Sequence, residues 1–224
     1  MEHLTASTRS LILKKLKPGQ NLLAVSKKQP VEKIRELYQQ GQRCFAENYI
    51  QEALEKIEIC QDLQIEWHLI GPIQKNKVKY LKNHFACLHS IDSLALAQLI
   101  SKKAVALNFC QKVFIQINLA EEISKSGFNE KQFLINWPEL KQLSGLNIVG
   151  LMTMPPLENA PEHNRKYFHR LKELAEQLDL KELSMGTSHD YEVALSEGAT
   201  WIRLGTILFG ERPQTSSPNQ ESHG

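Results

Sequence analysis

The stretch Leu22-Leu23-Ala24-Val25-Ser26-Lys27-Lys28-Gln29-Pro30 joins an apolar run to a turn punctuated by proline. The apolar run 22–26 is typical of a buried strand, and the stripe of Ile34, Leu37 and Tyr38 after the turn predicts a helix. Lys27 falls where the strand should end, which is the edge where parallel α/β barrels place their chemistry. A lysine there can also simply extend its amine into solvent, so position alone leaves both interpretations open.

The same unit of strand followed by helix recurs along the chain. Apolar runs predict eight strands, at residues 22–26, 43–46, 65–70, 86–91, 112–119, 146–151, 182–185 and 201–204. Helical patterns fill the gaps, and a further helix is expected at residues 2–16, before the first strand. The longest apolar stripe, Phe168 to Leu178 at spacings of three and four, predicts a helix that begins near residues 160–162.

Eight strands joined by crossover helices predict parallel pairing. In one chain of 224 residues this favours an α/β fold, a single closed (β/α)₈ TIM barrel with an extra N-terminal helix, over residues 1–212. The alternative is an open doubly wound sheet, but no glycine-rich dinucleotide motif follows the first strand. Residues 213–224 are polar without an apolar period and are expected to form a disordered tail.

The composition excludes several classes of protein. With 42% hydrophobic and 23% charged residues and a net charge of +2, it gives no argument for a nucleic-acid partner. The basic run 74–82 is expected to be a solvated helix face, with docking of an anionic partner as the alternative. No run approaches the roughly 18 apolar residues of a membrane span, and no secretory signal opens the chain, so we expect a cytoplasmic protein.

The four cysteines, Cys44, Cys60, Cys87 and Cys110, include no close pair. This spacing suits neither a disulfide framework nor a zinc site, and no metal is expected. Cys44, Cys87 and Cys110 lie in or beside apolar segments, so we expect buried, reduced thiols at these three positions.

Glycine and hydroxyl residues follow both the seventh and the eighth predicted strands. The first loop contains Gly186 and Ser188, and the second contains Gly205 and Thr206. Phosphate often binds at these two loops of a barrel, because glycine lets the backbone approach an anion and helix starts offer free amides. The four residues are therefore predicted to form one phosphate cup, with Ser188 at the start of a helix, although a serine there can also be a plain helix cap.

Arg203 ends the eighth strand, which lies beside the first strand once a barrel closes. It could form a surface ion pair or donate to a bound ligand. An amine at Lys27, a guanidinium and a phosphate cup on adjacent strands suggest a phosphorylated aldehyde ligand, because an amine can attack a carbonyl. Pyridoxal 5′-phosphate (PLP) is the candidate cofactor.

Seven motifs occur in order between residues 20 and 212: Ala24-Val25-Ser26-Lys27, Phe45-Ala46-Glu47-Asn48-Tyr49-Ile50-Gln51-Glu52, Trp67-His68-Leu69-Ile70-Gly71-Pro72-Ile73-Gln74-Lys75-Asn76-Lys77, Ser124-Lys125-Ser126-Gly127, Gly150-Leu151-Met152-Thr153-Met154, Leu183-Ser184-Met185-Gly186-Thr187-Ser188-His189-Asp190 and Arg203-Leu204-Gly205-Thr206. Together they resemble the PLP homeostasis proteins, whose fold-type III barrel is like the N-terminal domain of alanine racemase. Any one of them alone would be a weak match, whereas their order is specific.

The resemblance implies a role for most of the predicted site. Lys27 is expected to form a Schiff base with PLP, Asn48 to lie near its ring and Arg203 to face the pyridine nitrogen. Ser188, Gly205 and Thr206 are expected to hold the phosphate.

Two further positions are less settled. His68 on the third strand either lines the pocket or is a core histidine bonded to a neighbour. Ala46 stands where the family usually has glycine. The alanine would be strained if this position needed a positive φ.

The resemblance implies a PLP-binding protein of intracellular vitamin B6 homeostasis that holds PLP without substantial turnover and has no catalytic residues. The alternative is a PLP-dependent racemase of the alanine racemase type. A guanidinium at the ring nitrogen opposes its protonation, but alanine racemase tolerates a similar arginine. The chain leaves no segment for the β-rich second domain that supplies a tyrosine base in racemases, so we expect very slow turnover at most.

Expected partners are PLP itself and either PLP-dependent apoenzymes or amino acids. No nucleic acid or membrane partner is expected, and the protein is expected to be a monomer.

Overall fold

The computed structural model describes residues 2–122, 125–157 and 160–210. Its strands are β1 (Asn21–Val25), β2 (Cys44–Glu47), β3 (Glu66–Leu69), β4 (Cys87–Ile91), β5 (Gln111–Gln116), β6 (Leu146–Met152), β7 (Glu182–Ser184) and β8 (Trp201–Leu204). Its helices are α1 (Glu2–Leu13), α2 (Val31–Gln39), α3 (Ile50–Ile59), α4 (Leu94–Ala106), α5 (Glu130–Leu140), α6 (Arg165–Gln177), α7 (Tyr191–Ser196) and α8 (Thr206–Phe209), with 3₁₀ helices η1 (Lys75–Tyr80) and η2 (Pro161–Asn164). All eight predicted strands are present.

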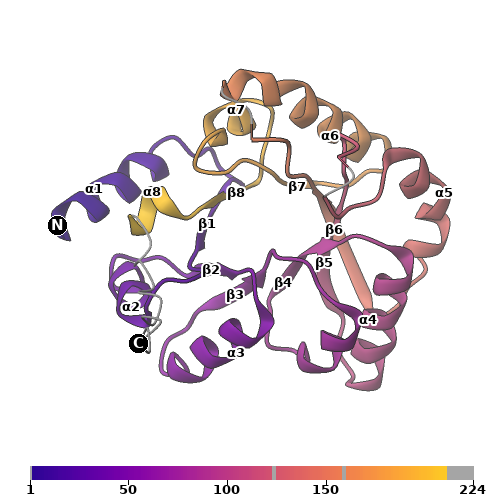
Figure 1. Cartoon of the computed structure of the whole chain (residues 1–224), viewed down its shortest axis with the longest axis horizontal. Coiled ribbons are helices and arrows are strands. Elements are labelled where there is room, and N and C mark those ends of the chain that lie inside the picture. Colours follow the sequence, from indigo (N-terminus) through magenta and orange to yellow (C-terminus); the bar gives the residue numbers. More distant parts are fainter. Residues whose placement is uncertain (1, 123–124, 158–159, 211–224) are drawn as a thin grey trace, which may run out of the picture.

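The strands form a closed barrel in which every neighbouring pair is parallel. β8 closes the ring against β1, with Leu22 opposite Ile202 and Leu23 opposite Arg203. Figure 1 shows the ring of strands with the helices around its outside. The structure confirms the predicted TIM barrel with an extra N-terminal helix, and the open doubly wound sheet is wrong.

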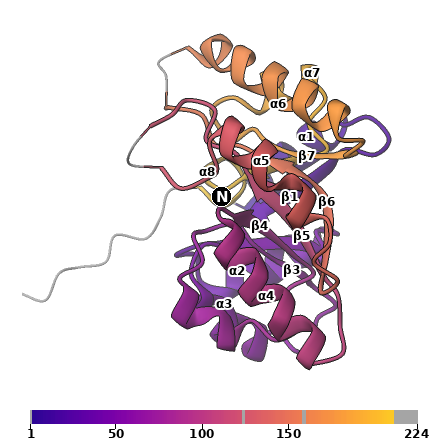
Figure 2. The same ribbon diagram turned by 90° about the vertical axis from the view of Figure 1, so that its right-hand side faces the viewer.

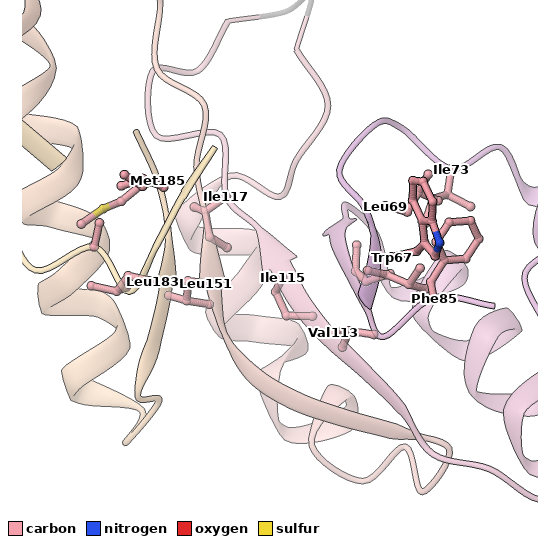
Figure 3. Close-up of a cluster of buried hydrophobic side chains, with 14 of the residues drawn as sticks. Trp67, Leu69, Ile73, Phe85, Val113, Ile115, Ile117, Leu151, Leu183 and Met185 are labelled. Atoms are coloured by element: carbon pink, nitrogen blue, oxygen red, sulfur yellow. The ribbon is translucent and has the colours of Figure 1, made fainter. Parts of the chain in front are cut away.

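Alternation along each strand divides the buried side chains into two sets. Side chains that face outward pack under the helices; Figure 3 shows this cluster around Trp67, Leu69, Val113, Ile115, Leu151 and Leu183. The inward set includes Leu23, Ala46, Phe114, Met152 and Trp201, which fill the barrel itself. The interior is therefore a packed core, and open space for a ligand is left to the ends of the strands.

The outer helices bury the apolar stripes that the sequence shows. On α6, Phe168, Leu171 and Leu174 are fully buried, and each such side chain contributes about 1.5–3 kcal/mol relative to an exposed one. α4 and α5 lie next to each other on the outside of the barrel (Figure 2). The expected start of α6 at 160–162 is occupied by η2, and the α-helix itself begins at Arg165.

One local prediction needed correction. α1 ends at Leu13 rather than at residue 16, because the amides of Lys15 and Leu16 bond to carbonyls three residues back rather than four. The basic run forms the short 3₁₀ helix η1, in which Val78 is buried while Lys75 and Lys79 are exposed.

All four cysteines are free thiols. Cys60 and Cys87 are buried and Cys44 is half-buried, but Cys110 is exposed in the loop before β5, so the prediction of burial was wrong there. Among the described residues, no helix has the length and apolar character needed to cross a bilayer. The predicted tail at residues 213–224 lies outside the described residues.

Candidate functional site

A cavity of about 730 Å³ opens at the carboxyl ends of the barrel strands. Six of the seven predicted ligand-binding residues line it: Lys27, Asn48, Ser188, Arg203, Gly205 and Thr206. These residues come from the loops after β1, β2 and β7 and from the β8 end, so barrel closure brings together positions far apart in the sequence. The volume lies in the range typical of small-molecule pockets.

Lys27 reaches the cavity because of strand alternation. Leu23 and Val25 face the barrel interior, and the same period of two carries Lys27 to that side, two residues beyond the end of β1. Lys28 has a positive φ of 57° and is exposed, so the chain turns sharply here. Lys27 therefore lines the cavity, whereas Lys28 does not.

Asn48 follows β2 and lines the cavity, and its side chain contains an unsatisfied polar atom. Its Oδ1 and the Oε1 of Gln29, another lining residue, are buried without a hydrogen-bond partner in the described structure. A Cβ at Gly71 would lie 2.1 Å from the Asn48 carbonyl oxygen, so only glycine lets the loop after β3 pass behind Asn48. Ala46 lies within β2 and has no positive φ, so the strain considered for it does not arise.

The loop after β7 presents Ser188 through a turn that Asp190 organises. Asp190 Oδ1 accepts from the Thr187 amide (2.7 Å) and from Thr187 Oγ1 (3.0 Å), and its Oδ2 accepts from Asn164 Nδ2 (2.7 Å). α7 begins only at Tyr191, with Asp190 before it. Ser188 therefore lies in the preceding turn rather than at the helix start, which corrects the expected position.

The loop after β8 brings Gly205 and Thr206 to the same cavity. They open the single turn α8, whose first amides have no acceptor within the helix. Gly186 differs from the other three cup residues, because it is buried and is not among the lining residues. Its φ is +89°, a Cβ would lie 2.6 Å from the Ala194 Cβ, and its carbonyl accepts from the Arg203 amide (3.0 Å).

Arg203 forms the floor of the cavity. Its Nη1 donates to Ser184 Oγ (2.9 Å) and its Nη2 to the Thr153 carbonyl (3.0 Å), both of which are neutral acceptors. Burial lowers the pKa of Arg203 to about 10, against the attraction of Asp190, so the guanidinium keeps its charge at neutral pH. The cavity therefore has a fixed, buried positive charge at its base.

Comparison with known sequences identifies the family. The profile described as alanine racemase, N-terminal domain, matches residues 5–213. A protein of Aquifex aeolicus named pyridoxal phosphate homeostasis protein is 44% identical over 197 residues, which are 85% of this chain and 86% of the relative. The chain belongs to the pyridoxal phosphate homeostasis protein family.

Solved structures support the fold of this family member. PipY of Synechococcus elongatus, solved with PLP bound, superposes with a TM-score of 0.85 at 38% identity, covering 92% of this chain and all of PipY. Alanine racemase of Clostridium difficile superposes with a TM-score of 0.79 at 18% identity. This match covers 95% of the present chain and 58% of the racemase, and it shows a shared fold alone.

Beneath Lys27, the homeostasis-family barrel contains a buried ion network that the sequence did not reveal. Lys56 Nζ donates to Glu47 Oε1 (2.8 Å), Glu52 Oε1 (2.7 Å) and the Ser26 carbonyl (2.6 Å). Ser26 Oγ also donates to Glu47 Oε1 (2.7 Å), and the Lys28 amide donates to Glu52 Oε1 (2.6 Å). The residues on both sides of Lys27 are thus tied to one buried ammonium group.

This network is costly to bury and therefore depends on all its members. Glu47 is 0% exposed and Lys56 6%. Burial raises the pKa of Glu47, while the Lys56 charge and the hydrogen bond from Ser26 oppose that rise. Without Lys56 the carboxylate would have to be protonated or exposed to water.

His68 lies in the barrel interior, bonded to His89, and is not among the cavity-lining residues. Of the two alternatives from sequence, the core histidine is the one that the structure shows. Burial lowers the pKa of His68 to about 3, with Lys112 as a smaller cause. Burial also holds the pKa of His89 well below its usual value, helped by His68, Arg203 and Lys112.

We expect these histidines to make the barrel sensitive to acid. Below about pH 6.5 the unfolded chain takes up protons at His68 and His89, whereas the folded chain does not, so the free energy of unfolding falls as the pH falls. Each histidine should cost about 1.4 kcal/mol at pH 5.5 relative to neutral pH. Urea denaturation at pH 7.5, 6.5 and 5.5 measures this; equal stability at all three values would contradict it.

Other contributors to the site were missed because they act through distant partners. Lys125 lines the cavity and bonds to Glu122 (2.8 Å) and the Pro155 carbonyl (2.9 Å), which ties together the loops after β5 and β6. Lys56 gave one usable signal, since it lies four residues after Glu52 on a predicted helix. Nothing in the sequence indicated its burial.

Proposed function

We propose that this protein binds PLP for intracellular vitamin B6 homeostasis, held as a Schiff base on Lys27 without substantial turnover. The observation that carries the proposal is that Lys27 shares one cavity with Arg203 and with the Ser188, Gly205 and Thr206 loops. In this arrangement the Lys27 amine would condense with the aldehyde of PLP and release water. The phosphate would lie against the hydroxyls and amides of the two loops.

The chemistry of the cavity suits this ligand. Two lysines and a buried guanidinium line it, so an anionic phosphate is favoured. The side chains of Asn48 and Gln29, each with an unpartnered oxygen, supply further polar groups at the cavity wall. The Aquifex aeolicus relative is named for pyridoxal phosphate homeostasis and PipY was solved with PLP bound, which supports the same assignment here.

Arg203 favours a holding role over broad PLP catalysis. PLP acts as an electron sink, and it does so best when the pyridine nitrogen is protonated. A permanently charged guanidinium facing that nitrogen would oppose its protonation. We therefore propose a carrier that exchanges PLP with apoenzymes or amino acids, as a cytosolic monomer.

Amino-acid racemisation is the alternative function, and Lys125 is the observation that favours it. Lys125 is a second amine on the Lys27 cavity, and racemisation needs an acid–base group on each face of the substrate. In this structure Lys125 is engaged by Glu122 and a backbone carbonyl. We expect negligible interconversion of D- and L-amino acids by the PLP-loaded protein, measured by chiral chromatography; robust turnover would overturn the carrier assignment.

The proposal is tested directly by trapping. PLP added to the purified protein should give a visible absorbance band that borohydride abolishes, and mass analysis of peptides should find the reduced adduct on Lys27. An adduct confined to another lysine, or no adduct, would reject the assignment.

A further inference from the structure

A line of hydrogen-bonded side chains crosses the barrel interior below the cavity. Arg203 on β8 donates to Ser184 Oγ on β7. Ser184 Oγ lies 2.8 Å from Nδ1 of His89 on β4, and His89 Nε2 lies 2.9 Å from Nδ1 of His68 on β3. All four side chains are at most 4% exposed, and of the four Arg203 is the one that lines the cavity.

The donors and acceptors in this line can be assigned from its ends. A guanidinium only donates, so Ser184 Oγ accepts from Arg203. The hydroxyl proton is then free to be donated to His89 Nδ1, which puts the His89 proton on Nε2. His89 Nε2 donates to His68 Nδ1, and His68 in turn carries its proton on Nε2.

The opposite direction leaves more groups unsatisfied. If His89 Nδ1 donated to Ser184, the buried hydroxyl would accept twice and its own proton would have no acceptor in the contacts of Ser184. His68 Nε2 has no hydrogen-bond partner in the described structure in either case. The first direction therefore leaves one unsatisfied group and the second leaves two, and each costs about 1–3 kcal/mol.

The charges around the line keep both rings neutral. Lys112 acts on both histidines and Arg203 acts on His89, so the nearby cations oppose a second proton on either ring. The Glu66 carboxylate and the Cys44 thiol come within 4.8 Å of a His68 nitrogen at the amino end of the barrel, and the Cys87 thiol is likewise close. The pKa of His68 is lowered all the same, because the effect of burial is larger than that of the carboxylate.

We infer that Ser184, His89 and His68 are positioning residues that hold Arg203 through a hydrogen-bond chain of one fixed direction. Because no charged partner is used, the guanidinium is oriented without being neutralised, and its charge remains available to a ligand in the cavity. This step rests on the proposed function, in which that ligand is PLP. The chain itself is a property of the ligand-free protein.

A metal ion is the competing occupant of the same cluster. His68, Cys87 and His89 offer ligand atoms within 4.8 Å of one another. Arg203 and Lys112 oppose a cation there, and the hydrogen bond between the rings already uses the lone pair of His68 Nδ1. Stoichiometric zinc in the purified protein, with its loss on chelation, would overturn the assignment.

The direction is tested by ¹⁵N NMR of the histidine rings in the ligand-free protein. At pH 7, both His68 and His89 should be neutral with the proton on Nε2. Ser184→Ala removes the donor to His89 Nδ1, so the His89 ring should lose its single tautomer, and Ser184→Thr, which keeps a hydroxyl, should restore it. A proton on His89 Nδ1 in the wild-type protein, or a charged ring, would contradict the inference. This measurement does not depend on whether Ser184→Ala folds.

The effect on Arg203 is tested with PLP as the probe. Ser184→Ala should weaken PLP binding about tenfold, as expected for one lost hydrogen bond to a charged group, and change the absorbance of bound PLP. Ser101→Ala is the matched control, because Ser101 Oγ accepts from the Gly145 amide (3.0 Å) in a buried site away from the barrel interior. Equal effects of both variants would show a structural role only, whereas absent binding by the wild type would reject the proposed function and leave the NMR result standing.

Discussion

Replacement of Lys27 by alanine is expected to abolish the visible absorbance of the PLP-treated protein. Lys27 is the amine at the end of β1 on the cavity that also holds Ser188, Arg203 and Thr206. Without it the other lysine of the cavity is Lys125, which is engaged by Glu122 and the Pro155 carbonyl and is not expected to condense with the aldehyde. The phosphate could still bind to the two loops. We expect complete loss of the borohydride-sensitive band and at least about tenfold weaker binding, or about 1.4 kcal/mol.

The neighbouring lysine provides the matched control. Lys28→Ala changes the same residue type one position later, but Lys28 is exposed, so this variant should keep the band. Lys27→Arg keeps a positive charge without an amine that can condense, and it should lose the band while retaining more affinity than Lys27→Ala. A wild-type spectrum from Lys27→Ala would mean that another residue holds the ligand.

Replacement of Lys56 by methionine is expected to destabilise the barrel by about 3–5 kcal/mol, because Glu47 is left buried without a counter-ion. The loss should grow as the pH rises. In the variant the pKa of Glu47 is raised further, because Lys56 no longer opposes the effect of burial, and Glu47 stays protonated in the folded protein. The folded state then binds more protons than the unfolded state, so the free energy of unfolding falls as the pH rises above about 4.3. Urea denaturation at pH 5 and pH 8 measures both the loss and its pH dependence.

Two further variants separate the buried charge from other effects. Glu47→Gln combined with Lys56→Met removes both charges and should recover much of the stability. Arg35→Met breaks the exposed ion pair with Asp62 and should cost no more than about 1 kcal/mol. A loss from Lys56→Met as small as that from Arg35→Met would show that the network does not stabilise the fold.

The fold could be predicted because each unit carries its own local pattern. β1, β8 and the helix stripe on α6 follow from apolar periodicity, and the count of eight strands then leaves the closed barrel as the natural arrangement. Helix starts were less certain, as at α6 and α7, because a turn stabilised by a distant side chain can replace the expected first turn.

The site was predicted in outline, while its supports were not. Lys27 and Arg203 stand at strand ends, where topology alone brings them to one edge. The partners of Arg203 are Ser184 on β7 and the Thr153 carbonyl just after β6, and Lys56 reaches Ser26 from a different element, so their pairing depends on the final packing. Such contacts do not follow the helix or strand period, so no pattern in the sequence predicts them.

Closure of the ring between β1 and β8 has a consequence for how the protein would acquire the proposed ligand. A ribosome-bound chain that has not yet added β8 has Lys27 but lacks the guanidinium and one of the two loops that face it. A vitamin captured as proposed would connect the earliest and latest strands to each other. Its release on unfolding would then be coupled to the opening of the whole barrel rather than of one segment. Saturation at a hundred times the dissociation constant would then stabilise the entire domain by about 2.7 kcal/mol.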